Sequence, residues 1–354
     1  MIKIWINEKD AGQRLDKYLR KYLAKSTSGF LYKMLRKKNI TLNGKKAAGN
    51  EMLQKKDEII LFLSDETILK FGGIVPKGGV YDGEGTSLLQ KSPQEEQRLE
   101  MRSEQYQKAY EAFGMLEIIF ENEHILVVDK PSGMLTQKAS QEDLSLNEWL
   151  IGYLMEKGEV NKITLHTFKP SVCNRLDRNT SGLVLCGKTL AGSQKISALL
   201  KERTLRKYYC MYVKGNITKG AQIEGYLKKD RQANRVELCK DAEDEDASYI
   251  KTIYKPLKNY RNMTMLEVEL VTGKTHQIRI HLASIGHPVL GDYKYGYLEF
   301  NDRYKKKYGV TTQLLHASRL EFPQMEGEWA DLSGLVLTAS NPKIFQMIDE
   351  SSEM

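Results

Sequence analysis

The chain has 354 residues, 41% of them apolar, which is enough for one large domain and one small domain, each with its own core. This composition excludes a disordered protein. The formal net charge is +8, and all of it lies near the N-terminus: residues 1–65 contain 15 Lys and Arg against 7 Asp and Glu, whereas the rest of the chain has 39 of each sign. Such a distribution is typical of a small nucleic-acid-binding module attached to a neutral domain, although a solvated charged surface gives the same count.

Four cysteines occur without any Cys-x-x-Cys pair, and most have apolar neighbours: Cys173, Cys186, Cys210 and Cys239. We expect them to be buried or inert thiols. The first residues reach charged positions too early for a signal peptide, and no apolar stretch is long enough to span a bilayer. The expected location is therefore the reducing cytoplasm, with no membrane role.

Residues 12–38 have the periodicity of two amphipathic helices. Their apolar positions form one face on each helix: Leu15, Tyr18, Leu19, Tyr22 and Leu23, then Phe30, Leu31, Met34 and Leu35. Basic side chains should cover the solvent side of the pair, with Lys21 among them. We predict that six of these cations bind RNA phosphates: Arg14, Lys17, Lys33, Arg36, Lys37 and Lys38.

A strand should follow from Ile40, ending in a hairpin turn at Asn43-Gly44, and a closing strand is predicted at 58–63. This order of elements, from Gly12 through the Asn-Gly turn, resembles the small helix-pair RNA-binding module shared by a small-subunit ribosomal protein and tyrosyl-tRNA synthetases. The resemblance predicts a small α-β RNA-binding module over residues 1–65.

Residues 66–113 change in character. A glycine-rich stretch at 71–85 predicts a mobile linker, and the polar run that follows predicts a helix at about 93–112. We expect this segment to give the first module reach rather than to carry chemistry.

From Leu116 the chain becomes rich in strands, which are predicted at 117–120, 125–129, 183–186, 208–213, 248–254 and 263–271. Helices are predicted near 145–156, 189–202 and 275–285. Strands of different lengths mixed with helices indicate an α+β fold, in which flanking helices cover a large mixed β-sheet. We assign residues 114–354 to this large domain.

Asp177 lies between Arg175 and Arg178 in the run from Asn174 to Gly182. Nearby opposite charges favour the carboxylate, so Asp177 could act as a nucleophile or a base. An Arg-Asp ion pair that only holds the loop is equally compatible with the local sequence. The apolar strand that follows at once would present the loop from a rigid edge, which favours a functional site.

The next residues, 182–189, match the phosphate-loop pattern G-x-x-x-x-G-K-T letter for letter. A phosphate loop needs a strand before it and exposed backbone amides inside it. Here the four inner residues are themselves the best strand of the neighbourhood, so we expect no nucleotide cofactor. The alternative is a phosphate-loop NTPase that depends on Lys188.

A second run, residues 271–288, predicts a helix capped by Thr275 and closed by Gly286 and Pro288, with the apolar stripe Ile278, Leu282 and Ile285. His276 and Arg279 share another helix face, from which the guanidinium could reach an anion. Zinc is the competing hypothesis. We expect no metal, because His276 and His281 point differently and no thiolates accompany them.

A third run, residues 206–213, alternates as a strand, so Tyr209 and Met211 should face one side and Tyr208, Cys210 and Tyr212 the other. A tyrosine there could stack on an extruded base. Aromatic packing between sheet layers is the alternative.

Five blocks in this order resemble the RluA-type (RluC/RluD-like) pseudouridine synthases over about residues 114–325: 129–133, 175–178, 207–209, 273–291 and 315–320. The resemblance implies that Asp177 is the catalytic aspartate, Tyr209 stacks on the target base and Arg279 pairs with Asp177. It also implies that Arg175 helps to hold the RNA with the uridine extruded. The family often has histidine at Asn174 and aspartate at Asn179, and these departures bear on how the RNA is read.

The activity implied is the isomerisation of specific uridines to pseudouridine in structured RNA, with no cofactor and no metal. The expected substrate is large-subunit ribosomal RNA, with transfer RNA as the alternative. A catalytically silent RNA-binding or ribosome-assembly factor on the same fold is the second alternative. We expect a monomer, and the sequence leaves open whether Asp177 acts as a nucleophile or as a base.

Overall fold

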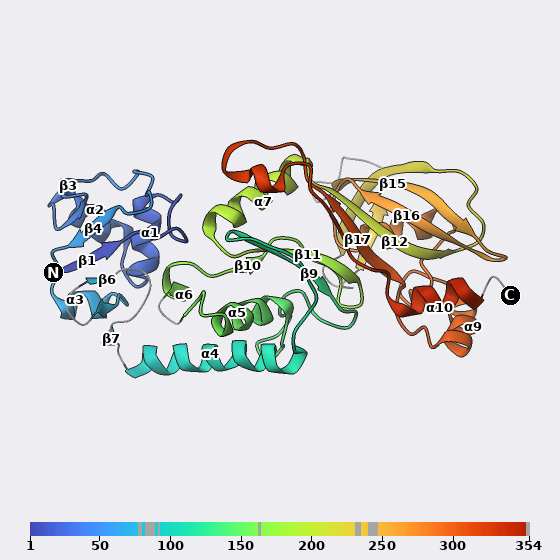
Figure 1. The fold of residues 1–354 in the computed structure, drawn as a ribbon, viewed down its shortest axis with the longest axis horizontal. Helices are drawn as coiled ribbons and strands as arrows, with labels where there is room; N and C mark the ends of the chain where they lie inside the picture. Colours follow the sequence, from blue (N-terminus) through green and yellow to red (C-terminus); the bar gives the residue numbers. More distant parts are fainter. Residues whose placement is uncertain are drawn as a thin grey trace.

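The computed structural model describes residues 1–76, 80–81, 89–90, 93–161, 164–230, 235–239 and 247–351. The N-terminal module lies at one end of an elongated molecule, and the C-terminus lies at the other end (Figure 1). Between these two ends lies a domain built on a long mixed sheet, and one long helix runs beside this domain.

The N-terminal module contains the predicted helix pair, α1 (Leu15–Tyr22) and α2 (Ser28–Arg36), and a sheet of order β3-β2-β4-β1-β6. Its strands are β1 (Ile2–Trp5), β2 (Ile40–Leu42), β3 (Lys45–Lys46), β4 (Glu58–Leu61) and β6 (Val80–Tyr81). The predicted Asn43-Gly44 turn is confirmed, because both residues have the positive φ that a type I′ hairpin requires, 52° and 70°. Strand β1, which was not predicted, lies between β4 and β6 and runs antiparallel to β4.

One apolar core joins this sheet to both helices and continues to Ile74 and Val75. The Tyr22 hydroxyl donates to the Ile74 carbonyl, and α3 (Asp65–Lys70), capped by Ser64, buries Ile68 in the same core. Packing therefore extends past residue 65, where the sequence predicted the module to end. The short pair β5 (Val75–Pro76) and β7 (Leu89–Gln90) follows, whereas residues 77–79 and 82–88 of the predicted linker lie outside the described residues.

The polar helix predicted at about 93–112 is α4 (Pro93–Phe113). Its C-terminal half packs on α5 (Leu146–Glu156), where Ala109 is fully buried and belongs to the same core as Trp149. A Cβ at Gly152 would come within 2.3 Å of the Tyr106 carbonyl oxygen, so the two helices approach as closely as glycine allows. This half of α4 is thus part of the core of the large domain.

The large sheet has eleven strands, in the order β14-β13-β15-β16-β12-β17-β11-β9-β8, with β10 beside β11 and β18 beside β17. Most neighbours are antiparallel, but β11 and β17 are parallel, so the predicted mixed sheet is confirmed. Five strands that the sequence analysis did not list are β10 (Ser171–Val172), β13 (Ala221–Asp230), β14 (Arg235–Cys239), β17 (Leu315–Glu321) and β18 (Val336–Thr338). The six predicted strands are β8 (Ile118–Glu121), β9 (Ile125–Lys130), β11 (Ser181–Gly187), β12 (Arg206–Lys214), β15 (Ser248–Asn259) and β16 (Met263–Leu270).

Helices cover both faces of this sheet, as predicted for an α+β domain. On one face α5 and α8 (Gln277–Ser284) close the largest core, which contains Tyr209 and Met211. On the other face lie α7 (Leu190–Glu202), α9 (Leu298–Tyr308) and α10 (Lys343–Ser351). The short helices α6 (Thr164–Thr167) and η1 (Gly327–Leu332), like α9 and α10, were not predicted. In the described part of the chain, no helix is long and apolar enough to cross a membrane.

Alternation along β12 agrees with the prediction, because Cys210 and Tyr212 belong to the core on the opposite face from Tyr209. Of the four cysteines, Cys186 and Cys210 are buried as expected, whereas Cys173 and Cys239 are half-buried. Burial raises the pKa of the Cys173 thiol to about 12, which keeps this thiol protonated and unreactive near neutral pH.

Candidate active site

A cavity of about 780 Å³ opens where three distant stretches of sequence meet: the loop before β11, the start of β12 and the start of α8. The proposed site residues Arg175, Asp177, Tyr209 and Arg279 all line it, as does His276. The fold therefore brings together residues that the sequence analysis singled out in separate blocks.

Asp177 is paired with Arg279, as the resemblance implied. The Arg279 Nη1 donates to Asp177 Oδ2 over 2.9 Å, although the two residues are 102 positions apart. Arg175 and Arg178, which were expected to supply the positive charge, are both exposed, and Arg178 donates instead to the Gly133 carbonyl. The charge beside Asp177 thus comes from α8 rather than from its neighbours in sequence.

Asp292 holds the other edge of the Arg279 guanidinium. Its carboxylate accepts from Nε over 2.7 Å and from Nη2 over 2.9 Å, and it also accepts from the backbone amides of Lys294 and Tyr295. Burial alone would lower the pKa of Arg279, but Asp292 and Asp177 together raise it above its usual value. Arg279 is therefore a fixed cation between two carboxylates, one exposed to the cavity and one only 1% exposed.

The sequence analysis did not identify Asp292, which lies one residue after the last residue of the fourth block of the resemblance. Nothing in its local sequence distinguishes it from an exposed acidic residue in the turn before α9. Its role is visible only once the chain after α8 has returned to the Arg279 side chain.

The loop that carries Asp177 is held by the turn after β9. Thr136 Oγ1 donates to the Leu176 carbonyl over 2.8 Å, and the Gly133 amide donates to the Arg178 carbonyl over 2.9 Å. The buried Lys130 ammonium donates to the same Arg178 carbonyl over 3.2 Å, and burial lowers the pKa of Lys130 to about 8. These contacts on both sides of Asp177 fix the direction of its side chain.

His276 corrects the predicted start of α8. It occupies the N-cap position expected for Thr275, with a left-handed φ of 54°, and makes no side-chain capping bond. Its Nε2 lies 3.7 Å from Asp177 Oδ2 and its Nδ1 lies 2.9 Å from the Tyr295 hydroxyl. Burial lowers the pKa of His276, although the charge of Asp177 opposes this shift. The imidazole therefore borders Asp177 from a second direction.

The remainder of α8 agrees with the prediction except at one position. Ile278 and Leu282 are buried, and Gly286 follows the helix with a φ of 83°. Ile285, predicted to complete the apolar stripe, is 38% exposed instead, because the helix ends at Ser284 and the chain turns there.

Tyr209 forms the floor of the cavity at the start of β12, where it is 5% exposed. Its ring packs in the main core, as one of the two predicted interpretations has it, and the same side chain also lines the cavity. Burial raises the pKa of its hydroxyl above the usual range, and the charge of Asp177 adds to this shift. The hydroxyl is therefore neutral over the physiological range.

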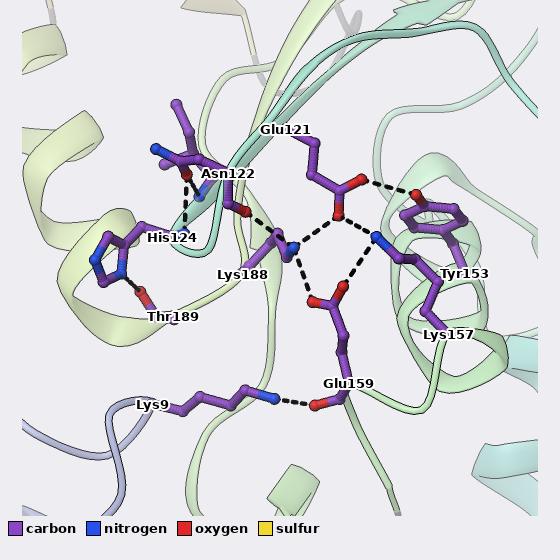
Figure 2. A network of polar contacts seen from close by, with 10 residues as sticks. Lys9, Glu121, Asn122, His124, Tyr153, Lys157, Glu159, Lys188 and Thr189 are labelled. Carbon is purple, nitrogen blue, oxygen red and sulfur yellow. Dashed lines mark hydrogen bonds and ion pairs between the residues drawn. The ribbon is translucent and has the colours of Figure 1, made fainter. Parts of the chain in front are cut away.

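Most of the stretch that matches the phosphate-loop pattern, residues 182–189, forms a strand. Residues Ser181–Gly187 form β11, and Thr189 caps α7 by accepting from the Gly192 amide. The Lys188 ammonium lies 2.6 Å from Glu121 and 2.8 Å from Glu159. Figure 2 shows these contacts in a network that includes Lys157. The backbone of this segment pairs with β9 instead of exposing its amides to a phosphate.

Among the described residues, no group of three or more His, Cys, Asp or Glu side chains is placed to hold a metal ion. His281 is fully buried, its Nδ1 lies 2.8 Å from Thr252 Oγ1, and burial lowers its pKa to about 4. Its partner therefore differs from those of His276, which lies beside Tyr295 and Asp177.

The N-terminal cations are mostly exposed: Lys17, Lys33, Arg36, Lys37 and Lys38. Arg14 differs, because its guanidinium donates twice to Asp16 over 3.1 Å. Lys21 also departs from the prediction, since it is half-buried and donates to Gln13 rather than facing solvent. Five of the six proposed RNA-binding side chains are thus exposed to solvent and free of such a pair within the described residues.

Comparisons with known proteins agree with this geometry. Residues 124–284 match the sequence model of the RNA pseudouridylate synthase family. The chain is 30% identical to the ribosomal large subunit pseudouridine synthase C of Rickettsia bellii, over 80% of this chain and 82% of that protein. The chain belongs to this family. It is an RNA pseudouridine synthase.

Two further relatives extend the comparison. The synthase is 34% identical to the ribosomal large subunit pseudouridine synthase D of Pseudomonas aeruginosa, over 51% of this chain and 53% of that protein. It is 28% identical to an uncharacterized RNA pseudouridine synthase of Mycoplasma genitalium, over 92% of this chain and 90% of that one. Human RNA pseudouridylate synthase domain containing 4 shares the fold with a TM-score of 0.53 at 20% identity, covering 70% of this chain and 95% of that one.

Proposed function

We propose that the synthase converts specific uridines of large-subunit ribosomal RNA to pseudouridine, with Asp177 as the catalytic carboxylate. The observation that carries the proposal is the Asp177–Arg279 pair at 2.9 Å on the wall of a cavity large enough for an extruded nucleotide. The substrate class is supported by the relatives named for ribosomal large subunit modification.

The reaction breaks the N-glycosidic bond, rotates the uracil within the site and forms a carbon–carbon bond to the same sugar. Substrate and product are isomers, so no atom or electron is gained or lost. Asp177 acts at the sugar, either as a nucleophile or as a base. Arg279, fixed by Asp292, holds that carboxylate in place, and Tyr209 provides a face on which the free base can rest.

The target uridine must leave its stack to reach Asp177, which costs a few kcal/mol and least in a loop or single strand. Arg175, exposed at the rim of the cavity, would hold the RNA in this state. The basic module over residues 1–65 would supply salt-dependent affinity through its exposed lysines and arginines, and residues 66–113 would connect it to the catalytic domain over 114–354.

The deciding experiment maps pseudouridine in ribosomal and transfer RNA from a deletion strain complemented with wild type, Asp177→Asn or Asp302→Asn. Asp302 is an exposed carboxylate on α9 that serves as the matched control. We expect one or more large-subunit sites to disappear on deletion and to return with wild type and Asp302→Asn only. If no site disappears, the proposal is wrong, and if the missing site lies in transfer RNA, the substrate assignment is wrong.

A binding measurement separates chemistry from recognition. Because Asp177 contacts Arg279 within a cavity whose lining includes none of the N-terminal cations, Asp177→Asn should bind large-subunit ribosomal RNA with unchanged affinity while forming no pseudouridine. If the protein were instead a catalytically silent RNA-binding factor, the pseudouridine content of cellular RNA would be the same with aspartate or asparagine at position 177.

A further inference from the structure

A second cavity, of about 560 Å³, lies at the end of β12 opposite from Tyr209. Three cations line it: Lys214 at the end of β12, Arg261 in the turn between β15 and β16, and Arg303 on α9. Glu299 is the carboxylate in the lining, so positive charge predominates. The chain after residue 65 is neutral in total, with 39 Lys and Arg and 39 Asp and Glu, but this part of its surface is basic.

These three cations differ from four other basic side chains of the catalytic domain. Lys188, Arg206, Arg279 and Arg319 each lie within 3.1 Å of a carboxylate. Within the described residues, Lys214, Arg261 and Arg303 have no such ion pair, and the close contact of Lys214 is with an aromatic ring. Unpaired cations that converge on one cavity favour an anionic ligand.

The aromatic ring belongs to Tyr297, which is 51% exposed. The Lys214 ammonium lies 4.0 Å from the ring centroid, so one face of the ring is held while the side chain remains open to solvent. Proteins that bind single-stranded nucleic acid combine cations, which contact the phosphates, with exposed aromatic side chains, on which the bases stack. This cavity has both.

The cavity shares no lining residue with the catalytic site, but short stretches of chain connect the two. Tyr295 contacts His276 and lies 5.1 Å from the Arg279 guanidinium, and Tyr297 follows two residues later, at most about 7 Å away along the backbone. Along β12, Lys214 is five residues from Tyr209, or about 16 Å. Lys214 faces the α9 side of β12 and Tyr209 faces the α8 side, so an RNA segment that reaches both must pass around the end of the sheet.

We propose that this second cavity is an RNA subsite of the catalytic domain, in which Lys214, Arg261 and Arg303 bind backbone phosphates and Tyr297 stacks on an unpaired base near the target uridine. The subsite adds to the proposed function and rests on it only for the identity of the RNA. With this subsite the catalytic domain binds the RNA substrate through contacts of its own, in addition to those of the N-terminal module.

The test compares two double variants that remove the same charge. Arg261→Ala with Arg303→Ala removes two exposed cations of the subsite, and Lys108→Ala with Lys343→Ala removes two exposed cations on α4 and α10. With transcribed large-subunit ribosomal RNA, we expect the first variant to raise KM about 10-fold at unchanged kcat. The slope of log affinity against log salt should fall by about 0.7 to 0.9 for each phosphate that the variant no longer binds. The second variant should match wild type.

Tyr297 supplies an independent test that leaves the charge unchanged. Tyr297→Ala should weaken RNA binding about 5-fold to 100-fold at an unaltered salt slope, whereas Tyr297→Phe should bind as wild type does. If the subsite variants behave like the α4 and α10 control while the wild type forms pseudouridine, the subsite is wrong and the proposed function stands. If the wild type modifies no ribosomal or transfer RNA, the proposed function is wrong, and the affinity of the same variants for the transcript still decides the subsite.

Discussion

The two parts of this enzyme use charge in different ways. In the N-terminal module the excess cations are exposed on α1 and α2, while the core beneath them is apolar. In the catalytic domain the charges are balanced, and many lie within the fold as bridges between strands and helices, such as Arg279 between Asp177 and Asp292 or Lys188 between Glu121 and Glu159.

This difference separates long-range attraction from local geometry. Exposed cations act on RNA through a screened field and can be moved with little effect on the fold. A buried ion bridge fixes the positions of its members, because removing one partner leaves the others desolvated and unpaired. We therefore expect charge removal to reduce affinity in the module and to reduce stability and turnover in the catalytic domain.

The strongest test of the comparison is Asp292→Ala. The variant leaves the Arg279 guanidinium buried without its two-point partner, so the free energy of unfolding should fall by about 3 to 5 kcal/mol. Arg279 would also lose the orientation that directs Nη1 to Asp177, so kcat should fall in the protein that remains folded. Denaturant unfolding and single-turnover kinetics measure the two effects. Unchanged kcat in Asp292→Ala, with the exposed Asp302→Ala as control, would show that Asp292 does not position Arg279.

The module also contains two buried carboxylates, Asp16, which forms an ion pair within the module, and Asp10, which contacts the catalytic domain. The latter carboxylate accepts from Thr167 of the catalytic domain, and burial raises its pKa to about 6, although Thr167, Lys21 and Lys9 oppose the shift. Since its unfolded pKa is about 3.9, the native state binds the extra proton, and stability should decrease as pH rises from about 4 to about 6. At pH 7 the ionised group should cost about 3 kcal/mol.

Asp10→Asn should therefore be more stable than wild type at pH 7 by up to about 3 kcal/mol, with no such gain at pH 4. Urea unfolding at both pH values measures this difference. Asp65→Asn, which changes an exposed carboxylate of the same module, is the control. A variant less stable than wild type at pH 7 would mean that the charged form of Asp10 contributes to the contact between the two parts.

The exposed cations of α2 and the turn after it give the next largest effect. Replacing Lys33, Arg36, Lys37 and Lys38 by alanine should weaken RNA binding about 10-fold to 100-fold and reduce the salt slope by about three. At saturating RNA, kcat should be unchanged because none of the four lines the catalytic cavity. Filter binding at several salt concentrations measures the slope. An equal weakening in the Lys108 and Lys343 double variant would mean that net charge matters and position does not.

Whether a feature could be predicted from the sequence depends on how far apart in the chain its interacting residues lie. The helix pair, the Asn43-Gly44 turn and the six predicted strands depend on periodicity and local φ preference, and the structure confirms them. Asp177, Arg279 and Tyr209 were selected from separate blocks, and their meeting at one cavity follows from the order of β11, β17 and β12 in the sheet. The elements and the three residues were thus identified from patterns within short stretches of the sequence.

The misses have a different origin. Asp292, the two-point partner of Arg279, and Asp10, a module residue bound to Thr167, depend on contacts between distant segments that leave no periodic signal. The expected cap Thr275 was displaced by one residue because His276 adopts a left-handed φ, which nothing in its neighbours requires. The local sequence suggested Arg175 and Arg178 as the charge beside Asp177, whereas the family resemblance pointed to Arg279, which is the residue that contacts it.

The smallest expected effect distinguishes burial from pairing. Arg206 bridges Glu269 and Glu321 at 2.9 and 3.1 Å, as Lys188 bridges Glu121 and Glu159, but the Arg206 side chain is 52% exposed and that of Lys188 is 5% exposed. If burial decides, Arg206→Ala should lower the free energy of unfolding by at most about 1 kcal/mol, and high salt should remove the difference. Lys188→Ala should lower it by about 3 to 5 kcal/mol at any salt concentration. Equal decreases in the two variants would show that the number of bridged carboxylates, and not their burial, makes the charges of the catalytic domain structural.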